Sequence, residues 1–598
     1  MRWNFLRRKK LWSSVGQRSG AESSKLGFSR APLEGVRIIQ PAGSGKKKEL
    51  CKEMDLEGYS HIWLIVTFIV GFFAVRMGVG IWASRKVTNA ADYIVAGRRL
   101  PIYMVGASVM ATWFAAETLL GASSTAYQYG FQGVVFDPFG AAACLFLSAF
   151  FFTRLMRRAR YLTVVDFFER RYGKGMTILA SMAQLLTYFV WTGAQIVAAG
   201  TIVVALFPDV PLEVGMALVT IWVVGYTMLG GMLADTMLDF IQMFFTAGGV
   251  TLIFVFLLIQ VGGWEGLTAI NETLNNPKPF TLLPDMTEGG AGYLGYFKAT
   301  GWIYWMAAWM AIGLGSVPTQ DLFQRSMSAR NESTAVWGTY LAGVLYLVFG
   351  VMSPLIGIMM YKLDPNVVNF DGILVMAALN YVPPVLVALF MAALASALMS
   401  TADSSLLAGA SVVTQNLFPL FGKKLDYASE VKWTRIMVAV NGTIGIAIAV
   451  SAAVIYELGV VAWSILLVGL FTPFAFGMYW KKANQYGAMA AFIGGFAAWA
   501  IGILIAYNIG IGGDSTLLVC EGDTDCAFWD ATYIASLPAF LTSIAMMVIV
   551  SLATQKQDAP KPITDVDGQP MDTNPVNYLG LIPIKDALRK LRPEELDQ

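Results

Sequence analysis

Residues 388–418, "ALFMAALASALMSTADSSLLAGASVVTQNLF", place a polar cluster inside an otherwise apolar run. Four residues of the run are spaced i, i+3, i+4 and i+7 and so share one face of a helix: Ala397, Ser400, Thr401 and Ser404. Hydrocarbon contains no water, so polar groups within a membrane helix face a cavity, an ion or one another. A backbone carbonyl and two hydroxyls on this face, with carbonyls freed where a neighbouring helix unwinds, predict a site for a hard monovalent cation such as sodium.

A structural alternative exists for each hydroxyl taken alone. Ser and Thr in membrane helices often bond back to the carbonyl of residue i−4 and have no further role. Five polar side chains within residues 400–405, including Asp403, favour the cation site.

The composition places this run in a membrane protein. Hydrophobic residues make up 56% of the chain and charged residues only 14%, with 58 glycines and a single histidine, which excludes an ordinary soluble protein. Apolar windows of about 20 residues, the length that crosses a bilayer, predict an all-α polytopic protein. Thirteen spans are predicted: 61–84, 101–128, 132–153, 175–207, 212–230, 238–261, 297–318, 335–361, 384–415, 434–456, 458–480, 485–508 and 531–554.

The loops between these spans predict the orientation. One alternating set of loops carries nineteen Lys and Arg, whereas the other set, counted from residue 54, carries only Lys278, Lys298 and Lys362. Basic residues are retained on the cytoplasmic side, so we expect a multi-pass protein of the cell membrane with its N-terminus outside and its C-terminus in the cytoplasm. Cys520 and Cys526 then lie in an outer loop, where we expect a disulfide.

The two ends of the chain are polar. Residues 1–53 carry thirteen Lys and Arg on the predicted outer side, against the positive-inside trend. We therefore expect synthesis to begin at Met54; a genuine disordered tail and a targeting segment are the alternatives. Residues 555–598 are polar and contain proline, which predicts a disordered cytoplasmic tail.

Two of the predicted helices contain breaks. The second reads "GASVMATWFAAETLLGASSTAYQYG" (residues 106–130), and the seventh reads "GWIYWMAAWMAIGLGSVPTQ" (residues 301–320), with Gly313, Gly315 and Pro318 close together. They lie five helices apart, and transporters built of inverted repeats place substrate and ions at such paired interruptions. Close packing at glycine is the alternative.

Several segments together resemble the sodium/solute symporter family of sodium/glucose, proline and choline transporters. They are "ADYIVAGRRLP", "GASSTAYQYG", "RYLTVVDFFERRYG", "TMLGGMLADTMLDFIQ", "PTQDLFQRSMSAR" and "MSTADSSLLAGASVVTQNLF", and the likeness covers about residues 60–555. The resemblance implies a leucine-transporter-like fold of five plus five inverted helices. The expected parts are a basic tail (1–53), the first helix and its loop (54–100), repeat 1 (101–262), an extracellular loop (263–296), repeat 2 (297–480), two further helices (481–554) and the C-terminal tail (555–598).

The resemblance also implies a sodium site and a function. By position, the family's sodium ligands fall on the backbone carbonyls of Ala111, Phe114 and Ala397 and on the hydroxyls of Ser400 and Thr401. This set includes the helix face identified above. The implied function is sodium-driven import of a small organic solute by alternating access, with sodium as the coupling ion, no other cofactor and no enzymatic activity. The expected partners are the solute, sodium and the lipid bilayer, and no nucleic acid.

The substrate is indicated by aromatic residues. Trp113, Trp191 and Trp305 fall where the choline-transporter branch has tryptophans, and such rings can enclose a quaternary ammonium group. Ala141 stands where that branch has a tyrosine, and Glu117 where it has a small residue. Glu117 and its neighbour Thr118 are candidates to face the cationic group, a second ion or a structural hydroxyl. The alternative for the tryptophans is packing or an interfacial position.

The order of expected solutes is a choline- or betaine-like cation, then proline or another small zwitterion, then a short carboxylate. Proton coupling through Asp403 or Glu117, passive transport and a membrane sensor remain alternatives. A membrane enzyme is disfavoured, since the only histidine is His61, at the edge of the first helix.

Other polar positions lie near helix ends or within spans. Asp137, before a proline, is interpreted as a helix cap, with a role toward substrate or ion as the alternative, and Arg76 as a residue that pairs or snorkels. Asp235 and Asp239, at the start of the sixth helix, and Gln324 with Arg325, at the end of "QDLFQR", are interpreted as gate or helix-end charges, in preference to substrate contact.

Overall fold

The computed structural model describes residues 61–85, 90–114, 116–207, 209–287, 292–367, 370–422, 426–452, 455–509, 524–572 and 580. The basic tail 1–53 and Cys520 of the predicted disulfide lie outside them. The described residues form helices, with isolated β-bridges and no strand. The helices of the first half are α2 (Ile62–Ser84), α3 (Ala90–Val95), α4 (Ile102–Trp113), α5 (Ala122–Tyr129), α6 (Ala141–Leu147), α7 (Thr153–Ala159), α8 (Val164–Tyr172), α9 (Lys174–Leu206), α10 (Leu212–Gln260) and α11 (Gly263–Thr268).

The second half continues in the same way. Its helices are α12 (Lys298–Gly313), α13 (Gln320–Met327), α14 (Glu332–Gly350), α15 (Met352–Leu363), α16 (Ile373–Tyr381), α17 (Pro384–Val412), α18 (Phe418–Leu420), α19 (Tyr427–Ala452), α20 (Tyr456–Leu466), α21 (Thr472–Tyr479), α22 (Gln485–Ile509) and α23 (Thr524–Ala553). Short π-helical turns join several of them, among them Ala116–Gly121 before α5 and Leu467–Phe471 after α20.

Within the described residues, eleven helical stretches are long and apolar enough to cross a membrane. The predicted count of thirteen is thus not confirmed. The two spans that account for the difference are the predicted second and seventh. The second is divided after Trp113, leaving the 12-residue α4, and its remainder runs on with the third span as Ala116–Ala159. The seventh is shortened to the 16-residue α12.

Both interruptions have a local backbone cause. Phe114, which follows α4, has ψ 65°, outside the helical range, so the helix cannot continue through it. α12 ends at Gly313, and Pro318 and an extended Thr319 precede α13. Gly315 lies in this second gap, where a Cβ atom would come within 2.4 Å of the carbonyl oxygen of Trp463. Only glycine permits this close approach to α20.

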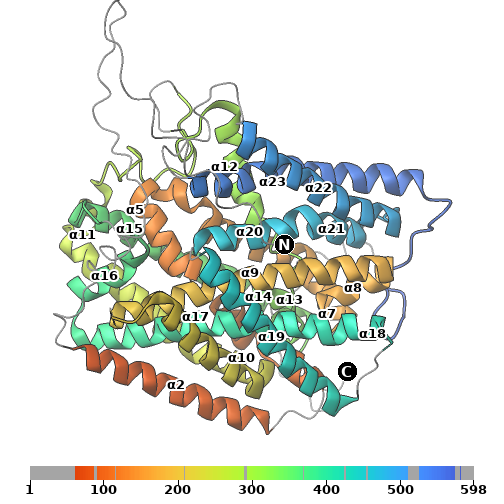
Figure 1. Ribbon diagram of the computed structural model, residues 1–598, viewed down its shortest axis with the longest axis horizontal. Helices are drawn as coiled ribbons and strands as arrows, with labels where there is room; N and C mark the ends of the chain where they lie inside the picture. Colours follow the sequence, from red (N-terminus) through yellow and green to blue (C-terminus); the bar gives the residue numbers. More distant parts are fainter. Residues whose placement is uncertain are drawn as a thin grey trace, which may run out of the picture. The chain divides into compact units, whose positions relative to one another are not determined.

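α17 lies in the middle of the bundle. It packs against α2, α4, α9, α10 and α19, and its residues from Val387 to Val412 are almost all buried. Figure 1 shows α9 and α17 between α2 on one edge and α22 with α23 on the other. The polar run 399–409 is therefore enclosed by protein on all sides, as its composition requires.

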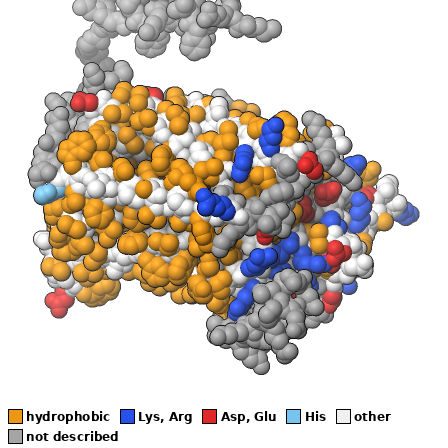
Figure 2. All heavy atoms as spheres, turned by 90° about the horizontal axis from the view of Figure 1, so that it is seen from below, with side chains coloured by type: hydrophobic (Ala, Val, Ile, Leu, Met, Phe, Trp, Pro, Cys, Tyr) orange, Lys and Arg blue, Asp and Glu red, His pale blue; other side chains and the backbone are white. Residues whose placement is uncertain are grey.

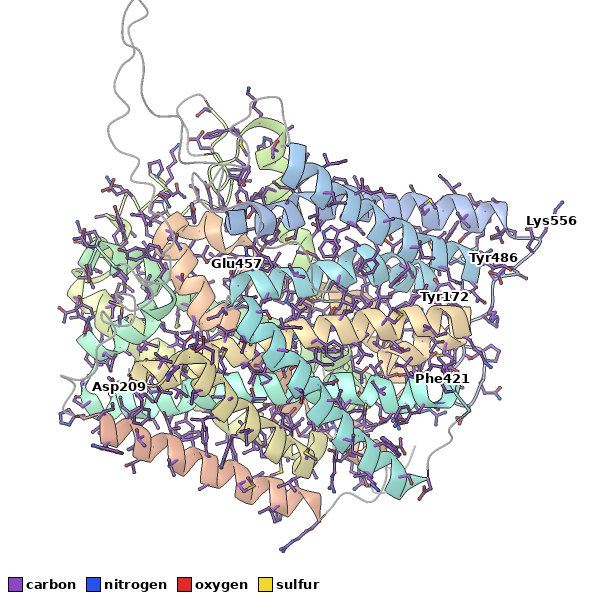
Figure 3. All side chains as sticks on the ribbon, viewed as in Figure 1. Tyr172, Asp209, Phe421, Glu457, Tyr486 and Lys556 are labelled. Carbon is purple, nitrogen blue, oxygen red and sulfur yellow. The ribbon has the colours of Figure 1, made fainter. Side chains whose placement is uncertain are left out.

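Charged residues gather at one end of the helices. Figure 2 shows hydrophobic side chains over the flank of the bundle and Lys and Arg toward one end. Tyr172, Tyr486 and Lys556 lie at this end and Asp209 at the opposite end, as Figure 3 shows. We call the first the basic end. Two of the loops predicted to lie on one side of the membrane, those next to Tyr172 and Tyr486, are therefore at the same end of the protein.

The predicted disorder of the C-terminal tail is wrong for residues 555–572. Ile563 is buried, and the amide of Val566 donates to the carbonyl of Ala159 over 3.0 Å. Arg160 pairs with Asp565 over 3.3 Å. Burial raises the pKa of Asp565, but bonds from the Gln569 amide and from Arg160 outweigh it and hold the pKa below its usual value. The segment stays folded because it binds to the corner between α7 and α8.

Candidate functional site

The interruption after α4 frees backbone carbonyls next to α17. In a continuous helix the amide of Ala116 would bond to the carbonyl of Thr112. Here that amide reaches the side chain of Gln195, at 3.4 Å, and the hydroxyl of Thr401 donates to the Thr112 carbonyl over 2.8 Å. The polar face of α17 therefore meets the break in the second predicted helix.

The five predicted sodium ligands are all buried in this region. Ala111 and Phe114 lie at the end of α4, and Ala397, Ser400 and Thr401 on α17. The Thr401 hydroxyl also lies 3.3 Å from the carbonyl oxygen of Ala397. The hydroxyl of Ser400 donates to a carboxylate oxygen of Asp239 on α10. A hydroxyl that donates its hydrogen keeps its lone pairs for a cation, so the oxygens present suit sodium.

Charged side chains lie next to Ser400. Arg325 of α13 lies 2.5 Å from Asp235 and 3.5 Å from Asp239, both on α10. Ser108 of α4 donates to Asp239 over 2.5 Å and accepts from Arg325 over 3.0 Å. The sequence interpretation of Asp239 and Arg325 as gate or helix-end charges did not foresee that they pair with each other.

A second arginine enters from outside the predicted repeats. Arg76 of α2 lies 2.9 Å from Asp403 of α17, and its side chain is 2% exposed. It also donates to Gln242, Ser396 and the hydroxyl of Tyr226, at 2.8, 2.9 and 2.8 Å. Arg76 therefore pairs within the bundle and does not snorkel. We call Arg76, Asp235, Asp239, Arg325 and Asp403 the charged network.

A cavity reaches this network. It is small, with a volume of about 20 Å³, and is lined by residues of α2, α10 and α17 that include Gly80, Tyr226, Asp235 and Asp403. Oδ1 of Asp235 is buried, and no donor among the described residues reaches it. The cavity thus brings solvent or an ion within reach of two carboxylates.

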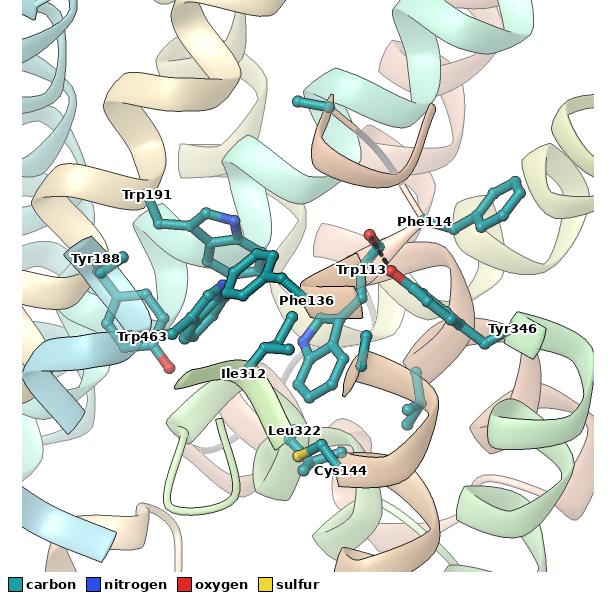
Figure 4. Close-up of a cluster of buried hydrophobic side chains, with 14 of the residues drawn as sticks. Trp113, Phe114, Phe136, Cys144, Tyr188, Trp191, Ile312, Leu322, Tyr346 and Trp463 are labelled. Carbon is teal, nitrogen blue, oxygen red and sulfur yellow. Dashed lines mark hydrogen bonds between the residues drawn. The ribbon is translucent and has the colours of Figure 1, made fainter. Parts of the chain in front are cut away.

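Three indoles and one acid form a second polar site at the same interruption. The ring centroids of Trp191 and Trp463 are 4.8 Å apart, and those of Trp113 and Trp463 are 6.1 Å apart (Figure 4). Glu117 accepts from the indole nitrogen of Trp191 over 2.8 Å and from Gln195 over 3.0 and 3.1 Å. We call Trp113, Trp191, Trp463 and Glu117 the aromatic chamber.

The chamber is held by neighbouring polar contacts. Trp113 donates its indole hydrogen to Asp321 of α13 over 2.7 Å, and Tyr188 of α9 donates to the other oxygen of Asp321 over 2.8 Å. These bonds join the two interrupted helices to α9. They fix the orientation of the Trp113 ring.

Thr118 and Asp137 belong to a separate cluster beside the chamber. Asp137 accepts from Thr118 and from the hydroxyl of Tyr346, each over 2.9 Å. The same hydroxyl lies 3.2 Å from the carbonyl oxygen of Trp113, the contact that the dashed line in Figure 4 marks. Asp137 has the extended backbone of a residue that precedes a helix, φ −142° and ψ 124°, but its carboxylate accepts these hydroxyls. Thr118 is thus engaged by a neighbouring acid.

The predicted substrate residues are brought together only in part. Trp113, Trp191 and Glu117 meet in the chamber, whereas Trp305 contacts Trp302 and Trp309 and donates to the carbonyl of Leu282 in the loop before α12. Trp463 takes the third place and was missed by the sequence analysis. The signal was a single Trp in "VVAWSILLVGLF", which apolar packing explains equally well.

A model of the sodium:solute symporter family matches residues 93–495. The chain belongs to this family. It is 26% identical over 457 residues to the high affinity choline transporter 1 of Homo sapiens, which covers 73% of this chain and 76% of that protein. It is 24% identical over 471 residues to the sodium/glucose cotransporter of Vibrio parahaemolyticus, covering 72% of this chain and 83% of that one.

The fold of this symporter also resembles solved structures. A Na+-coupled sialic acid symporter, solved in a substrate-bound outward-open state, superposes with a TM-score of 0.63 at 19% identity, covering 81% of this chain and 98% of that chain. At this identity the likeness concerns the fold alone. The fold class expected from the sequence, an all-α membrane protein with leucine-transporter-like architecture, is confirmed.

Proposed function

We propose that this symporter uses sodium to import a small quaternary ammonium compound, of choline or betaine type, by alternating access. The observation that carries the solute class is the aromatic chamber. Glu117 is buried there, and the groups that bond to its carboxylate, Trp191 and Gln195, are neutral. A buried carboxylate is costly without a cation, and indole faces attract ammonium groups by about 0.5–2 kcal/mol each.

The arrangement on α17 supports sodium as the coupling ion. Thr401 bonds to the freed end of α4 and Ser400 lies one residue before it, and both offer neutral oxygens, the ligands that hard cations take. Since both sites include residues at the end of α4, a cation bound at α17 and a solute bound at the chamber would both hold α4 in place. Each charge that moves inward across 100 mV contributes about 2.3 kcal/mol, which drives accumulation of solute.

The orientation is part of the proposal. We infer that the basic end faces the cytoplasm, because Lys and Arg near the spans are retained there. The sodium and the solute then enter from the end that carries the loop between α11 and α12.

Uptake into proteoliposomes tests the proposal. Radiolabelled choline, glycine betaine, proline and acetate are each offered with an inward sodium gradient, and in parallel with sodium replaced by potassium. We expect accumulation of choline or glycine betaine only in sodium. Equal accumulation in potassium would overturn sodium coupling, accumulation of proline or acetate alone would overturn the solute class, and flux without saturation would identify a passive pathway.

A further inference from the structure

The charged network contains more acids than bases. Two guanidinium groups, of Arg76 and Arg325, face three carboxylates, of Asp235, Asp239 and Asp403, so its formal charge is −1. All five side chains are at most 7% exposed. An uncompensated charge is costly in such surroundings. A buried cluster with a net negative charge therefore favours binding of as many cations as bring its charge to zero.

The hydroxyl face of α17, next to the network, can bind the cation that would neutralise it. Ser400 donates to Asp239, and Ser404 accepts from Arg325 and donates to the carbonyl of Ser400 over 2.7 Å. The network is therefore in hydrogen-bonded contact with the hydroxyl face of α17. One monovalent cation bound at that face brings the total charge to zero.

The positive charge of Arg76, which lies on α2, sets the net charge of the network. Its guanidinium lies against Asp403 and is held by Tyr226, which itself donates to Asp403 over 2.6 Å. The cavity lined by Asp235 and Asp403 ends at these groups. Without the guanidinium, Asp403 would face that cavity as a second uncompensated carboxylate.

We propose that Arg76 is a tethered counter-cation that occupies the position of a second mobile ion, and so limits the symporter to one sodium per cycle. This rests on the proposed sodium coupling. α2 then has a role in ion stoichiometry although it lies outside the inverted repeats.

Sodium binding to the purified, solute-free protein tests this without transport. The measurements are 22Na+ binding by scintillation proximity and the rise in melting temperature with sodium, followed by intrinsic tryptophan fluorescence. The wild-type protein binds one sodium with a Hill coefficient near 1. Asp403→Asn makes the network neutral, and its half-saturating sodium concentration rises about tenfold or more, as expected for the loss of a buried charge interaction.

Arg76→Gln leaves the network at −2, and we expect two sodium ions bound and a Hill coefficient that approaches 2. The double variant R76Q/D403N returns the sum to −1, so it binds one sodium with an affinity within about threefold of wild type, since the pair is removed together. Arg76→Lys is the matched control that keeps the charge, and it binds one sodium.

The outcomes separate the two claims. A wild-type protein that binds no sodium overturns the proposed function. A wild-type protein that binds one sodium, with Arg76→Gln also binding one and Asp403→Asn unchanged in affinity, overturns the role of Arg76. If a single variant does not yield monodisperse protein, the double variant R76Q/D403N tests the proposal. A sodium affinity about tenfold or more below that of the wild-type protein contradicts it.

Discussion

The aromatic chamber and the charged network are two buried polar regions that both contact α4, and they differ in how their acids are paired. The acid of the chamber, Glu117, is bonded by neutral groups of Trp191 and Gln195. The acids of the network are bonded by arginines of the same chain, as Asp403 is by Arg76. One region lacks a cation of its own, whereas the other contains two.

The difference teaches what each region is suited to do. A carboxylate without a fixed counter-charge gains most from a cation that arrives and leaves, because that cation removes a cost which the protein otherwise bears. A network in which two arginines face three carboxylates gains from one further cation, and little from a second. The chamber is thus suited to select a charged solute, and the network to limit the number of ions.

The largest expected effect comes from neutralising the chamber. Glu117→Gln keeps a hydrogen-bond acceptor for Trp191 but removes the charge, so we expect the KM for choline to rise about 100-fold, corresponding to about 2.7 kcal/mol. Uptake kinetics in proteoliposomes measure this change. The control is 3,3-dimethylbutanol, an uncharged analogue of choline, whose inhibition of uptake should change little.

An unchanged KM for choline in Glu117→Gln would contradict the claim that the chamber recognises the charge of the solute. The acid would then serve only to hold Trp191 and Gln195 in place, and the solute would not be a cation recognised by charge.

The next effect concerns the hydroxyl face that joins the two regions. Replacing both Ser400 and Thr401 by Ala removes two oxygens from the proposed sodium site, and we expect the sodium concentration for half-maximal uptake to rise about 10- to 50-fold. Sodium titration of uptake at fixed solute measures it. Ser411→Ala, on the same helix but bonded to the carbonyl of Ala408, is the matched control. A sodium dependence equal in the two variants would reduce these hydroxyls to packing.

The smallest effect separates two tryptophans. Trp463→Phe removes an indole from the chamber and should raise the KM for choline about 3- to 10-fold, in line with the strength of one cation–π contact. Trp305→Phe, outside the chamber, should change it less than about twofold. If the order of the two variants is reversed, the solute binds closer to the loop around Leu282 than to Trp463.

The fold was predictable because its signals are repeated along the chain. The apolar windows, the basic loops and the paired glycine-rich segments each follow from the solvent in which a membrane helix lies. The polar face of α17 was predictable for the same reason, since Ser400 and Thr401 cannot face lipid at low cost. Boundaries were less predictable: the backbone at Phe114 interrupts the helix without any glycine or proline at that position.

The contacts between distant helices could not be predicted. Arg76 and Asp403 are 327 residues apart, and no periodicity connects them. The same holds for Trp463, which reaches the chamber because Gly315 lets α20 approach the second interruption. In both cases the packing of the helices determines which residues come into contact. The periodicity of a single sequence reports on one helix at a time and does not show these contacts.

The C-terminal segment has a practical consequence for handling this protein. It begins at the end of α23, yet it is anchored to the corner near Ala159 and Arg160, and its own Ile563 is buried there. Removal of the residues after α23 would expose the apolar surface against which Ile563 packs. It would also leave the carbonyl of Ala159 without the amide of Val566 that now donates to it. Affinity tags are therefore better appended behind Gln598 than substituted for the tail.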